Sequence, residues 1–365
     1  MSKTILTIGD VHFKIGNIQE VDLFIQKINK VASDLNPDII VILGDVLDTH
    51  ERIHTTPLNK AYEFIDNMRK ITHTFVLVGN HDMCNNQQFL SENHWMNGMK
   101  KWDNVTIVDT VVQHIFTDTS ERKLPKIILC PYVPNGRFEE ALNTIGENNW
   151  RNSNLIFAHQ EFEGCKMGHI ISVSGDKWSL ENPTVISGHI HLKHRPQENI
   201  IYIGSAIQHA FGESENNTIS LIELSALEHD NGNIVSKTSF INTEIDLQLP
   251  KKKIIYMDVE EIVDFIIPET NDKIKITVSG SFDQFKSLKK TPKYKKIIDK
   301  GIKIIFKERR VNYTTGDNSN GECPNNLCNF INILTELVLK EPDCYLSEMF
   351  DLVIDNNIVS LIIND

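Results

Sequence analysis

Five short motifs in the first half of the sequence carry side chains that can bind divalent metal ions. They read GDVH, GDVLD, GNHD, AH and GHIH, from residue 9 to residue 191. Their candidate side chains are Asp10, His12, Asp45, Asn80, His81, His159, His189 and His191. Carboxylates, amide oxygens and imidazoles are ligands that manganese, iron and zinc accept, and no cysteine belongs to the set. Eight such groups exceed the needs of one ion and favour a site for two.

Two ions held by these side chains predict hydrolysis of a phosphate ester. A pair of ions about 3.5 to 4 Å apart clamps the attacking and leaving oxygens during in-line displacement and makes hydroxide available at neutral pH. We expect Asp45 to be the carboxylate that both ions share. The leaving alkoxide then needs a proton, and His81 fits the role of general acid. The next residue, Asp82, could hold one ring nitrogen of His81 and set its tautomer.

Each motif has a simpler explanation when it is taken alone. The stretch TVISGHIHLKH, residues 184–194, could be a metal site, a general-acid cluster or an exposed loop rich in histidine. GDVLD could be a turn with a helix cap at Asp48, and GNHD could be an ordinary Gly-Asn turn. The joint occurrence of the five motifs, each after an apolar segment, favours the metal site. The remaining histidines lie off this pattern and are expected to have structural roles: His50, His54, His73, His94, His114, His169, His194 and His209.

The elements that must position these side chains are short, apolar strands. Apolar segments rich in β-branched residues precede the five motifs, at 5–8, 38–43, 74–78, 155–158 and 185–187. Apolar residues recur at helical spacing in 18–35 and 58–71, and further strands are expected at 105–108, 126–130, 200–203 and 219–222. Apolar strands that alternate with helices predict an α/β fold with sheets covered on both faces. Because ligands bind at the carboxyl ends of the strands in such folds, the five motifs should converge on one site.

The composition fits a globular protein of more than one part. The chain has 365 residues, of which 40% are hydrophobic, and this is enough to bury a substantial core. The formal charge of -12 argues against a generic nucleic-acid-binding protein, although it allows a local basic surface. Six scattered cysteines predict free thiols in a reducing compartment, and we expect no targeting or membrane segment. The expected location is the cytoplasm, which is the host cytoplasm if the protein is from a phage or another virus.

The five motifs together resemble the calcineurin-like metallophosphoesterases, whose pattern is D-x-H, G-D-x-x-D, G-N-H-[DE], H and G-H-x-H. The resemblance covers about half of the chain and implies a two-sheet sandwich flanked by helices. It assigns the first ion to Asp10, His12, Asp45 and His191. It assigns the second ion to Asp45, Asn80, His159 and His189, and the role of catalytic acid to His81. The arginine of the protein-phosphatase motif is missing after Asp48, which argues against a protein phosphatase.

A finer resemblance concerns YIGSAIQHAFGE at residues 202–213. This stretch is similar to the strand and loop after the last histidine pair in SbcD-type nucleases, the nuclease subunits of DNA double-strand-break repair complexes. Those nucleases usually have Gly-Ser-Pro where this chain has Gly204, Ser205 and Ala206. The resemblance implies a DNA exonuclease or endonuclease that uses manganese, or else magnesium, iron or zinc. It also implies an SbcC-type coiled-coil ATPase as partner, with a homodimer of this chain inside a heterotetramer.

Two alternatives to the nuclease remain. One is a phosphodiesterase or phosphatase of the same fold that acts on nucleotides or other small molecules. The other is a non-catalytic scaffold. The basic segment at 281–310 and the terminal helices distinguish the nuclease from an enzyme for small molecules, because such an enzyme needs neither.

The last third of the chain predicts further parts after a nuclease domain at 1–245. Residues 273–280 and 302–310 read as strands around a helix pair broken near Pro292, and they predict a small α+β capping domain at 246–312. From Ser281 to Arg310, eleven Lys or Arg stand against three acids, a balance of +8. This segment is either a solvated helix face or a surface that contacts phosphates. The resemblance implies a domain that lies beside the cleft and helps to admit DNA.

A polar linker at 313–326 leads to two apolar helical stripes within 327–365. Their apolar positions include Leu327, Phe330, Leu334, Leu346 and Phe350. Two short amphipathic helices beyond a linker need a partner for their apolar faces. Packing on the core is one explanation and docking on another protein is the other. The resemblance implies that this segment grips the coiled coil of the ATPase.

Overall fold

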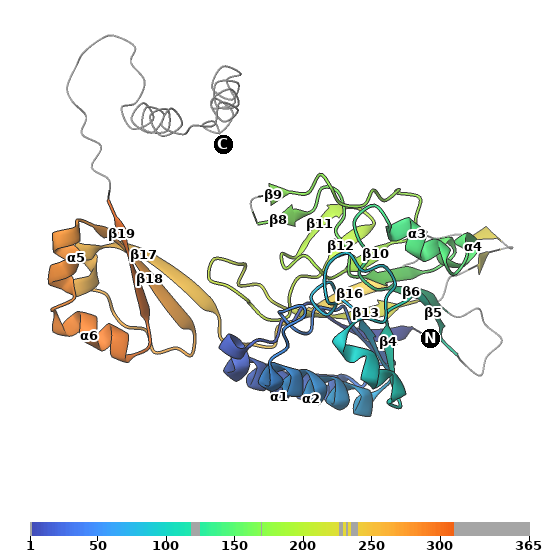
Figure 1. Cartoon of the computed structure of the whole chain (residues 1–365), viewed down its shortest axis with the longest axis horizontal. Coiled ribbons are helices and arrows are strands. Elements are labelled where there is room, and N and C mark those ends of the chain that lie inside the picture. Colours follow the sequence, from blue (N-terminus) through green and yellow to red (C-terminus); the bar gives the residue numbers. More distant parts are fainter. Residues whose placement is uncertain are drawn as a thin grey trace, which may run out of the picture. The chain divides into compact units, whose positions relative to one another are not determined.

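The computed structural model describes residues 2–117, 125–168, 170–225 and 240–309, with two short strands at 229–230 and 233–234 (Figure 1). Two mixed sheets of six strands form its centre. The first has the order β16 (Phe240–Ile245), β13 (Ile219–Leu224), β1 (Lys3–Ile8), β2 (Ile39–Ile42), β3 (Thr74–Leu77), β4 (Val105–Val108). The second has the order β11 (His194–Gln197), β12 (Ile200–Tyr202), β10 (Val185–Ser187), β7 (Leu155–Ala158), β6 (Lys126–Cys130), β5 (Val112–Ile115).

Each sheet has a parallel centre. Strands β1 to β4 are parallel, and β13 is antiparallel to both β1 and β16. In the second sheet β6, β7, β10 and β12 are parallel, whereas β5 and β11 are antiparallel edge strands. The carboxyl ends of the parallel strands therefore lie at the same end of each sheet.

The two sheets pack face to face, as the alternation of side chains along β2 shows. Ile39 and Val41 join the cluster between the sheets, whereas Ile40 and Ile42 point to the opposite face. The same alternation on the second sheet puts Ile156 on its outer face and Phe157 between the sheets. Full burial of such a side chain contributes about 1.5 to 3 kcal/mol. Because every central strand is buried on both faces, the strands are apolar throughout rather than alternating.

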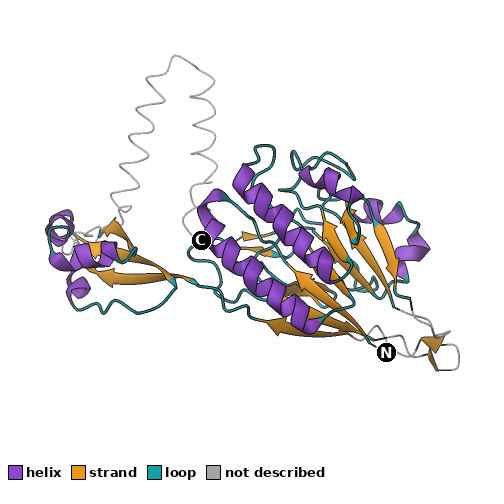
Figure 2. Cartoon of the chain, turned by 90° about the horizontal axis from the view of Figure 1, so that it is seen from below, coloured by secondary structure: helices purple, strands orange, loops and turns teal. Residues whose placement is uncertain are grey.

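Two long helices, α1 (Ile18–Leu35) and α2 (Thr55–Ile71), lie next to each other over the outer face of the first sheet (Figure 2). Helix α1 presents Val21, Phe24, Ile25 and Ile28 to the core, which is the spacing of one helical face. It ends where Asn36 adopts a left-handed conformation, with φ 45°. The short helices α3 (Phe138–Asn143) and α4 (Glu147–Arg151) contribute to the core on the outer face of the second sheet.

Short elements complete the two-sheet body. They are the 3₁₀ turns η1 (Ile15–Asn17) and η2 (Trp95–Lys101) and the two-residue strand pairs β8 (Lys166–Met167) with β9 (Ile170–Ile171) and β14 (His229–Asp230) with β15 (Asn233–Ile234).

A small parallel sheet follows the two-sheet body. Its strands are β17 (Lys252–Asp258), β18 (Lys273–Gly280) and β19 (Lys303–Glu308), with η3 (Val259–Val263), α5 (Phe282–Leu288) and α6 (Pro292–Asp299) beside them. Its core contains Ile276 and Val278 from the sheet and Phe285 and Ile297 from the helices. Pro292 stands at the first position of α6, where its missing N–H costs nothing.

Polar contacts tie the small sheet to the body. The carboxylate of Glu20 on α1 accepts hydrogen bonds from the Nζ atoms of Lys252, at 2.8 Å, and Lys273. The side chain of Gln208 accepts from the backbone N–H of Lys252 at 2.6 Å and donates to its carbonyl at 3.1 Å. Glu20 is 9% exposed, so this pairing is better shielded from solvent than a surface ion pair.

The predicted α/β fold with two sheets flanked by helices is confirmed, and the predicted strands are all present. Helix α1 matches the predicted span, and α2 begins three residues earlier than predicted, at Thr55. The pattern analysis missed polar edge strands such as β5, β11 and β16, and also β17. The linker at 313–326 and the terminal helices lie outside the described residues. Within the described ranges, none of the helices has the length and apolar character that a membrane span requires.

Candidate metal centre

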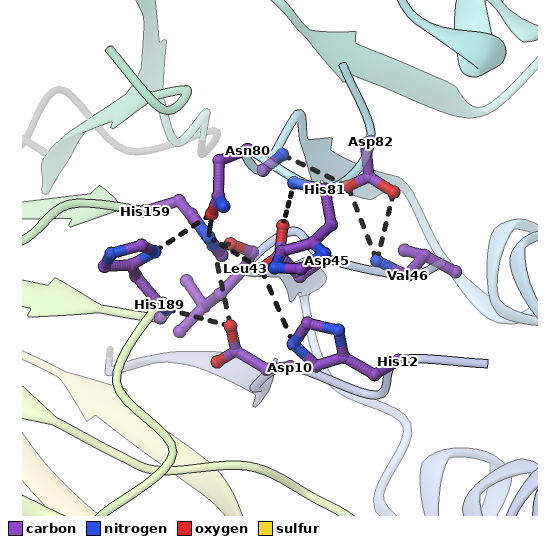
Figure 3. A network of polar contacts seen from close by, with 12 residues as sticks. Asp10, His12, Leu43, Asp45, Val46, Asn80, His81, Asp82, His159 and His189 are labelled. Carbon is purple, nitrogen blue, oxygen red and sulfur yellow. Dashed lines mark hydrogen bonds and ion pairs between the residues drawn. The ribbon is translucent and has the colours of Figure 1, made fainter. Parts of the chain in front are cut away.

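The loops after five strands bring together all seven predicted metal ligands, most of which are labelled in Figure 3. The ligands and the strands before them are Asp10 and His12 after β1, Asp45 after β2, Asn80 after β3, His159 after β7, and His189 and His191 after β10. Two of these strands belong to the second sheet and three to the first, so the site spans the carboxyl ends of both sheets.

The backbone is strained where it delivers three of these side chains. His12, Asp45 and His189 have φ values of 42°, 48° and 75°, in the left-handed region that residues other than glycine avoid. Such residues cost of the order of 1 to 3 kcal/mol each, and they cluster at functional sites. Gly79 allows the loop after β3 to lie close to Asp45, since a Cβ atom at position 79 would overlap the carboxylate of Asp45.

One group of ligand atoms surrounds the side-chain oxygen of Asn80. The Nδ1 atom of His189 lies 2.9 Å from it and the Nε2 atom of His159 lies 3.1 Å from it. His159 Nε2 is also 3.3 Å from Asp45 Oδ2. The other ring nitrogen of His159 donates to the carbonyl of Leu43 at 2.7 Å, which leaves Nε2 for a metal ion.

A second group of ligand atoms lies on the other side of Asp45. His12 Nε2 is 3.1 Å from His191 Nε2 and 3.5 Å from Asp45 Oδ2. Asp10 Oδ1 accepts the backbone N–H of His189 at 2.8 Å, whereas its Oδ2 is buried without a hydrogen-bond partner among the described residues. An unsatisfied buried acceptor costs about 1 to 3 kcal/mol, and a bound cation would satisfy it. The residues present therefore fit two divalent ions that share Asp45.

The electrostatics of these side chains agree with this fit. Burial holds the pKa of His12 well below its usual value and, with the charge of His159, lowers that of His189 to about 4. Both rings are thus neutral at pH 7 and offer lone pairs. Burial alone would lower the pKa of His159, but the charge of Asp45 outweighs it and raises the pKa to about 9. Metal binding therefore displaces a proton from His159.

His81 lies against this site but its ring is held by a different group than expected. Its Nδ1 atom donates to the carbonyl of Asp48 at 2.8 Å, and its backbone N–H donates to Asp45 Oδ1 at 2.9 Å. The ring packs edge-on against His12, with centroids 4.9 Å apart. Because a carbonyl can only accept, Nδ1 donates in this hydrogen bond and the opposite ring nitrogen is left for proton transfer.

Asp82 does not orient His81, so that prediction is wrong. Its carboxylate accepts from the backbone N–H groups of Val46 at 3.2 Å, Leu47 at 3.3 Å and Gly79 at 3.1 Å, and from the indole of Trp95 at 2.8 Å. Burial and the nearby charge of Asp45 raise its pKa to about 6. Asp82 instead fastens the loop after β2 to the loop after β3, and so supports both Asp45 and Asn80.

Sequence reasoning missed three residues at this site. His50, which was expected to be structural, stacks on the ring of His81 with centroids 4.8 Å apart and planes 11° apart. His209 packs against His12 and His191, and Glu213 Oε1 lies 3.5 Å from His191 Nδ1. His209 and Glu213 belong to the stretch 202–213, which is similar to the strand and loop after the last histidine pair in SbcD-type nucleases. Nothing in its spacing shows that it folds back onto His12.

Comparisons with known proteins agree with this geometry. Residues 3–193 match the family model described as "Calcineurin-like phosphoesterase". The chain is 45% identical over 352 residues to "Putative phosphoesterase 078R" of Invertebrate iridescent virus 3, covering 95% of each protein. It is 49% identical over 288 residues to "Putative phosphoesterase 244L" of Invertebrate iridescent virus 6, covering 78% of this chain and 97% of that protein.

Among solved structures, "GAP50 the anchor in the inner membrane complex of Plasmodium" aligns with 66% of this chain and 89% of its own. The TM-score is 0.39 and the identity 14%, values too low to bear on function. The family match covers more than half of the chain and contains all seven predicted ligands. The chain belongs to the calcineurin-like phosphoesterase family.

Proposed function

We propose that this phosphoesterase is a metal-dependent DNA nuclease, the nuclease subunit of a double-strand-break repair or recombination complex of the SbcCD type. The family accounts for metal-dependent hydrolysis of a phosphoester, and the proposal adds the substrate. Its main support is the basic surface of the small sheet, α5 and α6. The exposed lysines of α5, α6 and the residues next to these helices are Lys286, Lys289, Lys290, Lys295, Lys296 and Lys300. Within the described residues none of the six forms an ion pair, so they are available to phosphates.

A cavity beside the metal ligands also supports a nucleic-acid substrate. It has a volume of about 660 Å³, and His189, His191, Lys166 and Phe211 contribute to its lining. A cation and an aromatic ring are the groups that bind the phosphate and the base of a single strand. Lys275 of β18 lies over the ring of Phe211, 4.9 Å from its centroid, and brings a cation of the small sheet to this wall.

The chain's own side chains have distinct tasks in the proposed reaction. When bound, two divalent ions, with manganese the expected one, supply a hydroxide nucleophile at neutral pH and neutralise the phosphate. The Asp45 carboxylate would bind both ions, because its Oδ2 atom lies near ligand atoms of both groups. The ring nitrogen of His81 opposite Nδ1 donates a proton to the departing sugar oxygen, while Asp48 holds the ring.

Parallel assays of linear double-stranded DNA and a chromogenic phosphodiester test the substrate, each with manganese and with magnesium. We expect Lys289→Glu and Lys296→Glu to weaken DNA cleavage and flatten its dependence on salt, with the small phosphodiester unaffected. Lys101→Glu, an exposed lysine on the two-sheet body, is the matched control. If DNA cleavage is unchanged in both basic-surface variants, or DNA is not cleaved, the small-molecule phosphodiesterase becomes the better proposal.

The proposed partner is a coiled-coil ATPase of the SbcC type, bound through 327–365, with a homodimer of this chain inside the complex. The support is the pair of apolar stripes in the sequence, since this segment lies outside the described residues. Because both relatives are viral proteins, the proposed setting is the cytoplasm of an infected host cell. Deletion of 326–365 should leave manganese-dependent cleavage of short DNA intact and abolish co-purification with the ATPase. Unfolding of the truncated chain would contradict the proposal.

A further inference from the structure

His209 forms a triangle of imidazoles with two predicted ligands. Its ring centroid lies 4.8 Å from that of His12 and 4.7 Å from that of His191, and those two rings are 4.9 Å apart. One potential ligand atom from each ring lies within 4.8 Å of the other two. The five motifs of the sequence do not include this residue.

Among the described residues, the hydrogen bonds of His209 leave one of its ring nitrogens without a partner. Its Nε2 atom donates to the carbonyl of Asp10 at 3.1 Å. Its Nδ1 atom is buried and has no hydrogen-bond partner among the described residues. The ring is held in this position because the carboxylate of Glu213 accepts from the backbone N–H of His209 at 2.8 Å and of Ala210 at 3.0 Å. In the neutral ring with Nε2 protonated, Nδ1 carries a lone pair and is an acceptor only.

This arrangement is the one found for metal-binding histidines, which donate one ring N–H to a carbonyl or carboxylate and bind the ion with the other nitrogen. His159 shows the same division, with Nδ1 on the carbonyl of Leu43 and Nε2 among ligand atoms. If His209 only supported the Asp10 loop, its buried Nδ1 atom, which has no partner among the described residues, would cost about 1 to 3 kcal/mol with nothing to offset that cost.

We infer that His209 is an additional ligand of the ion held by Asp10, His12, Asp45 and His191, which it binds through Nδ1. Octahedral coordination, which manganese accepts, has room for this fifth protein ligand. The inference rests on the metal centre of the family and not on DNA as the substrate. His209 could prove not to be a ligand while DNA remains the substrate. Conversely, DNA could prove not to be the substrate while His209 remains a ligand.

Direct detection of the metal–nitrogen bond tests this inference without an activity assay. The full chain, with an NMR-active nitrogen isotope in its histidines, is loaded with NMR-active cadmium, and one-bond cadmium–nitrogen couplings are counted. We expect five coupled ring nitrogens, from His12, His159, His189, His191 and His209. In His209→Phe, which retains the ring volume, one Nδ1 coupling disappears. Four couplings in the wild type, with none lost in the variant, would overturn the assignment. The wild-type spectrum alone decides if the variant does not fold.

Manganese affinity gives a second readout. Titration of metal-free protein should show one of two sites weakened by about 10- to 100-fold in His209→Phe, with the other unchanged. His114→Phe is the matched control, because His114 on β5 packs against Phe75 and Phe116 and contacts none of the ligands. Equal affinities in wild type and His209→Phe would contradict the inference.

Discussion

At the scale of single residues, Asp45 is the side chain that contacts both groups of candidate ligands. Its Oδ2 atom lies 3.3 Å from a ring nitrogen of His159 and 3.5 Å from one of His12, and these histidines belong to different ligand groups. Its Oδ1 atom accepts the backbone N–H of His81 at 2.9 Å. Although burial alone would raise its pKa, the charge of His159 holds that pKa well below the usual value. The carboxylate is therefore ionised at neutral pH and available to both ions.

The first prediction concerns His81. His81→Ala should retain both metal ions and slow phosphodiester cleavage by roughly 10² to 10⁴, the usual contribution of a positioned proton donor. Metal content and turnover are measured on the same preparation. His81 shares a ligand-atom cluster with His12 and Asp45, so the outcome is informative. Loss of an ion in this variant would make His81 a ligand instead of the acid.

The second prediction concerns Asp82, whose carboxylate accepts four hydrogen bonds while 2% exposed. Asp82→Asn places an amide N–H₂ among donors, so the free energy of unfolding should fall by about 1 to 3 kcal/mol. Chemical denaturation of the metal-free protein measures it, with the exposed Asp103→Asn as control. Unchanged stability together with lost activity would return Asp82 to a catalytic role.

Residue types and spacing were sufficient to predict that the seven candidate ligands lie close together, because each follows an apolar strand and the carboxyl ends of these strands meet. They were not sufficient for Asp82, because its hydrogen-bond donors include backbone N–H groups of a loop 35 to 36 residues earlier in the sequence. They also missed His209, which reaches Asp10 across 199 positions. Hydrogen-bond partners of this kind depend on how the loops fold back, and no local pattern encodes that.

At the scale of the elements, short loops at the strand ends position the candidate metal ligands. Strand β2 ends at Ile42 and β3 at Leu77, and Asp45 and Asn80 each follow three residues later. Continuous apolar strands were predictable from the sequence because both faces of each sheet are covered. Polar edge strands such as β11 were not, because their pattern resembles that of a loop.

The third prediction tests one of these loops. In Gly79→Ala the added Cβ would overlap the carboxylate and backbone N of Asp45, so manganese affinity should fall at both sites. Gly98→Ala is the matched control, since nothing lies within 4 Å of a Cβ at that position. Isothermal titration with manganese compares the two variants with the wild type. Equal affinities would show that the loop after β3 can move away without disturbing Asp45.

At the scale of the molecule, the site depends on two sheets that pack face to face and whose carboxyl-end loops come together. The first sheet supplies Asp10, Asp45 and Asn80, and the second supplies His159 and His189. The class of the fold followed from the order of elements in the sequence. The order of strands within each sheet did not, because pairings such as β1 with β13 join residues more than two hundred positions apart.

The manganese content of wild type and Asp45→Asn tests the central claim, that one carboxylate joins two ions, most directly. Both proteins are stripped with a chelator, reloaded, freed of unbound metal and assayed for bound manganese and phosphodiester cleavage. Two ions per wild-type chain are expected. In Asp45→Asn, metal content and activity should fall together, because the shared ligand is weakened for both sites. Full activity with a single bound ion, or undiminished metal binding by Asp45→Asn, would contradict the account.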